Sequence, residues 1–183
     1  MATLTVKTRL PTRDVQARFV SLPKILAGSA PDPLGLRRMF FAIFARKLYS
    51  LIYEAYKIKS LGGTDSLGHS WRGLKKRTVN RRLSPSFLSR YPLSAQLLIN
   101  RVNDRLLESF RPGQVSGANY IPSREQRYLL ESFRLLLGSE VPYAAKVHAK
   151  RRLWPARMRS WIEQATNLAF DHVLIHLTRS LES

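Results

Sequence analysis

The sequence contains no cysteine, so neither disulfide bonds nor thiolate metal sites can hold the fold together. Packing of side chains has to do so instead. Long apolar runs are also missing, because no stretch approaches the roughly 18 residues that a membrane-spanning helix needs. From Met1 to Val20, charged side chains interrupt what would be the apolar core of a secretory signal peptide. We therefore expect a soluble protein that is not attached to a membrane.

Acidic residues are scarce. The chain has 12 Asp and Glu against 31 Lys and Arg, which gives a formal net charge of +19 at pH 7. This charge is larger than solubility requires, and it predicts attraction to polyanions. The polyanions that fit such a charge are DNA, RNA and acidic protein surfaces.

Two segments contain no acidic residue at all. The first runs from Ser66 to Asn103 and includes Arg72, Lys75, Lys76, Arg77, Arg81, Arg82, Arg90 and Arg101. The second runs from Val141 to Ile162 and includes Lys146, Lys150, Arg151, Arg152, Arg157 and Arg159. We expect two basic patches on the surface. Solvated faces of a basic protein would give the same pattern, since charge patterning alone identifies neither a partner nor a sequence preference.

Motifs of the common enzyme and nucleic-acid-binding families are absent. The sequence has no nucleophile elbow, no phosphate-binding loop, no zinc-finger spacing and no RNA-recognition string. His172 and His176 lie four residues apart on a predicted helix and could share a metal ion. No further ligand is close to them in the sequence, so a solvated or interface pair is favoured. Carboxylate pairs brought together by the fold stay open. We predict no enzymatic activity, no catalytic residues, no cofactor and no metal.

Length and composition predict a single domain over residues 1–183. A chain of 183 residues with 44% hydrophobic content can build one ordinary core, and two domains would each be small. Within residues 1–31, the alternation of apolar and polar residues from Leu4 to Leu10 predicts a half-buried strand. A connector rich in Pro and Gly follows it.

A long amphipathic helix is predicted next. Asp32 is a typical N-cap and Pro33 a typical first helical residue, and Gly62-Gly63 would end the helix after Ser60. Apolar residues recur along the helix at spacings of three and four. The aromatic members of this stripe include Phe40, Phe41 and Phe44. Such a cluster could line a cofactor site, but aromatic residues at helical spacing are more typical of a core.

A second long helix is predicted to begin at Pro155. Its apolar face comprises Met158, Trp161, Ile162, Ala165, Leu168, Ala169, Val173 and Leu177. Between the two long helices, a short basic helix is predicted over residues 74–82, before Ser84-Pro85. Trp71 is expected to anchor the preceding loop to the core, although tryptophan is also enriched in subunit interfaces.

Two identical strings of six residues stand between the helices, at Leu106–Arg111 and Leu129–Arg134. We predict that both are strands of one hairpin, because polar and apolar residues alternate in them. Helix stays open for both, since Leu, Glu and Arg favour it. The residues between them are rich in turn formers, and we interpret residues 112–123 as an inserted loop.

Three sequence elements in a fixed order suggest a family. The first is Gly68-His69-Ser70-Trp71-Arg72-Gly73-Leu74 with Thr78 and Arg82, the second is Leu137-Gly138-Ser139 with Val141-Pro142-Tyr143-Ala144 and His148, and the third is the C-terminal helix. In this order they resemble the virion-morphogenesis, or tail-completion, family of tailed bacteriophages. The resemblance covers Leu34 to Leu181, and the sequence departs from the family pattern after His148.

The resemblance implies an α+β fold, with an antiparallel sheet packed against a long N-terminal helix and a C-terminal helix. It also implies a structural subunit of the head–tail junction, located at the virion neck or the head-proximal end of the tail, and in the host cytoplasm during assembly. The expected partners are copies of the chain in a ring of six or twelve, other neck, portal or tail proteins, and the packaged DNA. A monomeric basic nucleic-acid-binding protein is the alternative, and an adaptor in a non-viral complex is a third.

The candidate site residues lie in two basic loops that also carry aromatic residues. For assembly they are Trp71, Arg72, Lys75, Lys76, Arg77, Tyr143, Lys150, Arg151, Arg152 and Trp154. Arg81 and Arg82 are candidates for contact with DNA phosphates, which is independent of base sequence. Tyr143 is also expected to cap the edge of the sheet against the long helix, because its large ring needs an apolar surface and its hydroxyl needs a partner.

Overall fold

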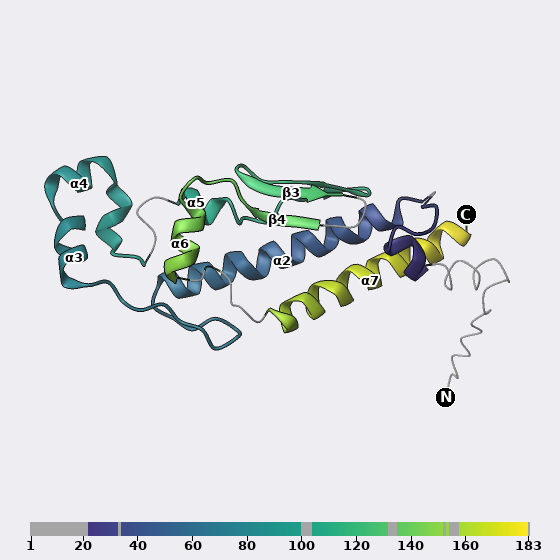
Figure 1. Cartoon of the computed structure of the whole chain (residues 1–183), viewed down its shortest axis with the longest axis horizontal. Helices are drawn as coiled ribbons and strands as arrows, with labels where there is room; N and C mark the ends of the chain where they lie inside the picture. Colours follow the sequence, from purple (N-terminus) through teal and green to yellow (C-terminus); the bar gives the residue numbers. More distant parts are fainter. Residues whose placement is uncertain are drawn as a thin grey trace, which may run out of the picture.

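Two long helices and two small hairpins make up the body of the protein. The structure is a computed structural model. It describes residues 22–32, 34–99, 104–131, 135–151, 153 and 158–182. Helix α2 (Leu36–Ser60) and helix α7 (Arg159–Glu182) run antiparallel along each other, as Figure 1 shows. The described strands form two antiparallel sheets that pack with these helices, so the predicted α+β class is confirmed. The strand predicted over Leu4–Leu10 lies outside the described residues.

Helix α2 begins three residues later than predicted, although the predicted capping residue does cap it. The Asp32 carboxylate accepts hydrogen bonds from the backbone N–H groups of Leu36 (2.7 Å) and Arg37 (2.9 Å). Gly35 makes the turn between Asp32 and the first helical residue, with a left-handed φ of 65°. Asp32 thus satisfies two of the unpaired N–H groups at the start of the helix. Pro33 lies outside the described residues.

The end of α2 is as predicted. Gly62 has a φ of 85°, a conformation that glycine adopts without steric cost. The N–H of Gly63 then donates to the carbonyl oxygen of Ile58 at 3.0 Å, which satisfies one of the last carbonyls of the helix. The chain leaves α2 at this point in a loop that runs to Leu74.

The α2–α7 contact is narrower than the sequence pattern predicted. The buried residues of α7 are Trp161, Ala165, Ala169, Val173 and Leu177. They recur at every fourth position, and side chains at this spacing form a ridge that packs into a groove of the neighbouring helix. Ile162 and Leu168 were predicted on the same face but are 44% and 39% exposed. On α2, the ring of Phe40 packs against those of Phe41 and Phe44, with centroids 5.3 and 6.3 Å apart. Phe40 is buried in the core, and the other two rings are partly buried against it, so the interpretation of the cluster as core is confirmed.

The described strands pair only with their neighbours in sequence. Strand β1 (Gln114–Ser116) pairs with β2 (Asn119–Ile121), and β3 (Gln126–Leu130) pairs with β4 (Leu135–Ser139). Most of residues 112–123, which we interpreted as an inserted loop, form the first hairpin, so the segment is not an irregular loop. That it is an insertion stays a prediction. Its tight turn passes through Gly117, whose φ of 56° is the left-handed conformation that such turns require.

The two identical strings fold differently, so the strand prediction was wrong for the first of them. The first copy begins inside the short helix α5 (Arg105–Glu108), which buries Leu106 and Leu107. In the second copy, Leu129 and Leu130 belong to β3 and pair with Leu136 and Leu135, and residues 132–134 lie outside the described residues. Tertiary context decides between the two states, since a short apolar string has no strong preference of its own.

Tyr49 of α2 joins the helix to both hairpins. Its hydroxyl donates to the carbonyl of Arg127 in β3 and accepts from the N–H of Gly138 in β4 at 2.8 Å. Its ring stacks on Tyr120 of β2, with centroids 6.2 Å apart. We predicted that Tyr143 would hold the sheet edge against α2, but Tyr143 is 37% exposed, and the tyrosine that performs this role comes from the helix.

Candidate functional site

Residues 75–99 form a unit that we call the basic arm. It contains the short helices α3 (Lys76–Arg82) and α4 (Pro85–Arg90) and the 3-10 helix η1 (Pro92–Gln96). Figure 1 shows α3 and α4 beyond the C-terminal end of α2, away from α7 and from the hairpin of β3 and β4. The arm helices pack mainly on one another, through contacts of α4 with η1 and of α3 with α4. The helix predicted over residues 74–82 is confirmed as α3.

The arm presents cations to solvent and has no carboxylate of its own. Its exposed basic residues are Lys75, Lys76, Arg77, Arg81 and Arg90. Because no Asp or Glu occurs between Ser66 and Asn103, no acidic side chain of the arm itself can neutralise them. Such a surface attracts phosphates or carboxylates of another molecule, and the attraction weakens as salt rises.

Aromatic rings lie among these cations. The guanidinium carbon of Arg81 is 5.4 Å from the ring centre of Phe87, and that of Arg90 is 5.5 Å from the ring centre of Tyr91. The rings of Phe87 and Tyr91 are themselves 5.1 Å apart. Cation–π contact of this kind orients a guanidinium without burying its charge. The arm therefore combines cations with flat apolar surfaces, as many nucleic-acid-binding surfaces do.

Arg82 does not belong to this exposed set, so its assignment as a phosphate contact was wrong. Its side chain is buried, with 6% of the residue exposed, and one guanidinium nitrogen donates to the carbonyl of Leu98 at 2.5 Å. The Arg82 carbonyl in turn accepts from the hydroxyl of buried Ser94 at 3.2 Å. Arg82 thus holds α3 against the returning chain, and the N–H of Ile99 then donates to the carbonyl of Ser60 at the end of α2 (2.8 Å).

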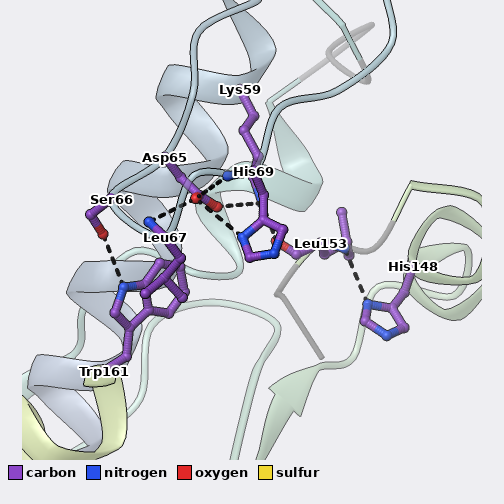
Figure 2. Close-up of polar contacts among 8 residues, drawn as sticks. All are labelled: Lys59, Asp65, Ser66, Leu67, His69, His148, Leu153 and Trp161. Atoms are coloured by element: carbon purple, nitrogen blue, oxygen red, sulfur yellow. Dashed lines mark hydrogen bonds and ion pairs between the residues drawn. The ribbon is translucent and has the colours of Figure 1, made fainter. Parts of the chain in front are cut away.

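A buried ion pair secures the loop that leads from α2 to the arm (Figure 2). The Lys59 ammonium lies 3.2 Å from the Asp65 carboxylate, and 1% or less of either side chain is exposed. Lys59 also donates to the carbonyl of Leu153 at 3.2 Å and lies over the ring of Trp71, 5.1 Å from its centre. Trp71 is buried and also packs edge-on against Tyr56. Trp71 is therefore a core anchor, and its assignment as an assembly contact was wrong.

The environment of this pair shifts both pKa values. Burial lowers the pKa of the Lys59 ammonium, and Asp65 opposes the shift. Burial alone would raise the pKa of the Asp65 carboxyl, but the N–H groups of His69 (2.9 Å) and Leu67 (3.0 Å) and the Lys59 ammonium hold it below its usual value. The Asp65 carboxylate therefore stabilises the loop by accepting backbone hydrogen bonds and also neutralises the charge of Lys59.

The loop is also tied to the start of α7. The indole N–H of Trp161 donates to the Ser66 hydroxyl at 3.0 Å, as Figure 2 shows. In the same region, the N–H of Leu153 donates to the ring of His148 at 3.2 Å. The bond between Ser66 and Trp161 fixes the loop at the base of the basic arm to the start of α7, which lies 95 residues further along the chain.

The second predicted basic loop is described only in part. Tyr143 lies in the turn just before α6 (Ala144–Arg151), and Lys150 lies near the end of this helix. Both residues are exposed. Arg152, Trp154 and the side chain of Arg151 lie outside the described residues. In the first loop, Arg72, Lys75, Lys76 and Arg77 are exposed, as the assembly prediction requires.

A groove that the sequence did not predict lies beside α7, formed with α2 and the first hairpin. Its lining includes both histidines that were weighed as metal ligands, His172 and His176. Among the described residues, no three His, Cys, Asp or Glu side chains come together as metal ligands would. None of the helices in the described ranges has the length and apolar character of a membrane span.

Comparison of the chain with protein-family models, with curated proteins and with solved structures gave no match.

Proposed function

We propose that this chain is a structural subunit of a tailed-phage head–tail junction, in which the basic arm contacts a polyanionic partner. The observation that carries the proposal is the arm itself. It extends past the end of α2, exposes five basic side chains and carries no carboxylate. The polyanion is either the DNA that leaves the head or an acidic face of a neighbouring ring.

The residues that resemble the tail-completion family support this proposal because they have structural roles in the fold. Trp71 of the first element is buried against Tyr56 and Lys59. Gly138 of the second element bonds to Tyr49, and Val141 is buried directly after β4. The α+β arrangement is the one that the resemblance implied. A protein of this kind acts through surface complementarity and has no chemistry of its own.

Assembly in a ring is part of the proposal. Head-to-tail contacts between copies generate closed rings when the rotation between neighbours closes. In such a ring, the arms of all copies would present their cations repeatedly to the same partner. Phosphate contacts made in this way do not depend on base sequence, which suits a subunit beside DNA of any sequence.

A salt titration tests the role of the arm. Duplex DNA of random sequence is titrated with the wild-type protein and with a variant in which Lys75, Lys76 and Arg77 are changed to Gln. If these three cations contact phosphates, the slope of log K against log salt should become shallower by up to about 3. In a control variant, Lys24, Arg38 and Arg127 are changed to Gln, since they are exposed outside the arm. Equal slopes for the two variants would contradict a role of the arm.

The same observation favours one alternative, a monomeric nucleic-acid-binding protein, because cations interleaved with aromatic rings suit single-stranded nucleic acid. The two functions differ in the partner they prefer. A junction subunit should associate stably with portal or tail proteins of the same phage, and bind free nucleic acid only weakly at physiological salt. Tight binding to free RNA or DNA by a monomer, without any such association, would support the alternative.

A further inference from the structure

The groove beside α7 has three walls. Helix α2 forms one wall, helix α7 forms the second, and the chain around β1 forms the third. The lining residues of α2 are Met39, Ile43, Arg46, Lys47 and Ser50, those of α7 are Leu168, His172, Ile175, His176 and Arg179, and those of the third wall are Pro112, Val115 and Gly117. The groove is open to solvent and has a volume of about 570 Å³.

The charge of the groove has one sign. Arg46, Lys47 and Arg179 line it together with two histidines, and no Asp or Glu is among the described residues that line it. Within the described part of the chain, none of these three cations forms an ion pair with a carboxylate. The residues that the structure describes therefore leave the positive charge of the groove uncompensated.

Apolar side chains lie between the cations. Leu168 and Ile175 of α7 are 39% and 49% exposed, although both are large and apolar. They face the groove together with Met39 and Ile43 of α2, which are half-buried, and Val115 of β1. An exposed apolar surface bordered by charges is typical of a binding site for another protein.

The length of the groove indicates the kind of segment that fits. Along α2 the lining runs from Met39 to Ser50, which corresponds to about 16 Å of helix axis at the standard rise. About three turns of a bound helix would cover this distance. A helix with apolar residues at spacings of three and four would place them on the apolar strip, and acidic residues beside them would face the cations.

We propose that this groove binds an acidic amphipathic helix of a partner protein. Charge complementarity selects this occupant. A second copy of the chain carries the same net charge of +19, and the segment from Met1 to Val20 is basic, so neither complements the groove. The proposal concerns a surface separate from the basic arm, and it does not depend on the assignment to a phage junction.

Fluorescence anisotropy with a synthetic peptide tests the proposal. The probe is a labelled peptide of about 14 residues with Leu at spacings of three and four and Glu at most other positions. Wild-type protein should bind this peptide, and Lys47→Glu with Arg179→Glu should weaken the binding at least about tenfold. Leu168→Ser with Ile175→Ser, which leaves the charge unchanged, should weaken it as well. Both apolar side chains are partly exposed, so this variant should keep the wild-type far-UV circular dichroism spectrum.

A matched control separates the groove from general attraction between opposite charges. Lys75→Glu with Lys76→Glu changes the net charge by the same amount in the basic arm and should leave the affinity within about twofold of wild type. Three results would overturn the proposal: no binding by the wild-type protein, an equal loss of affinity in the arm variant, or equal affinity for a peptide of the same composition in scrambled order.

Discussion

Asp65 is the residue on which the loop before the arm depends most. Asp65→Ala would leave the Lys59 ammonium buried without its partner and would free the N–H groups of Leu67 and His69. Removing one member of a buried pair destabilises a protein by about 3–5 kcal/mol. Glu54→Ala is the matched control, because its pair with Lys57 is exposed and should contribute almost nothing. Urea denaturation measures both, and equal losses in the two variants would show that Asp65 has no special role.

Because of Tyr49 and Tyr120, which lie between α2 and the hairpins, we expect the protein to lose stability at high pH. Burial is the main reason why the pKa values of both Tyr49 and Tyr120 are raised, that of Tyr120 to about 12. The unfolded chain releases these protons near pH 10, earlier than the folded chain does. Their contribution is therefore complete below about pH 10 and is lost as the pH rises toward the folded-state values.

Tyr49→Phe tests this assignment. The variant has no phenol at this position, so its free energy of unfolding should fall less steeply than that of the wild type between about pH 10 and pH 12. Urea titrations at a series of pH values give the two curves. Parallel curves would contradict the role of Tyr49. At neutral pH the variant should also be less stable by about 1–3 kcal/mol, because the N–H of Gly138 loses its acceptor.

Among single elements, the first hairpin depends on Gly113, where the backbone of the chain approaches Tyr120 and Ile121 closely. A Cβ atom at this position would lie 2.2 Å from the carbonyl oxygen of Ile121 and 2.8 Å from the ring of Tyr120. The N–H of Gly113 also donates to the Tyr120 hydroxyl at 2.8 Å. Gly113→Ala should therefore destabilise the protein by about 1–3 kcal/mol, through strain in the hairpin.

The control for this prediction is Gly73→Ala. A Cβ atom at Gly73 would have no neighbour within 4 Å, and its backbone is not in the left-handed region. Thermal unfolding of the two variants gives the comparison. A melting temperature for Gly113→Ala that equals that of Gly73→Ala would show that the close approach of the backbone at Gly113 is not needed.

The capping residue and the C-terminal end of α2 could be predicted from the sequence because their signals are local. Asp32 and Gly62 mark the ends of α2 through hydrogen bonds that span a few residues. The identical strings could not be assigned in the same way. Leu106 is buried in a helix and Leu129 is exposed in a strand, although each is the first residue of the same six-residue string. The two strings differ in the segments of the protein against which they pack. These segments are distant in the sequence, so the string itself does not reveal them.

For the whole molecule, the α+β class was expected from the resemblance of three sequence elements to a known family, and it is confirmed. The position of the functional surfaces could not be predicted in this way. Exposure of the cations at Lys75, Lys76 and Arg77 was predicted from charge alone. The burial of Arg82 in the same helix was not, because it depends on the carbonyl of Leu98. The groove was missed for the same reason, since its three walls come from segments that are far apart in the sequence.

We propose that this chain joins phage heads to tails through its surfaces. Electron microscopy of lysates tests it most directly, with the gene for this chain inactivated in a phage that carries it. The account predicts filled heads and tails that remain separate, and joined particles when wild-type protein is supplied. Protein with Lys75, Lys76 and Arg77 changed to Glu should restore far fewer of them. Joined, infectious particles in normal number without the chain would contradict the account.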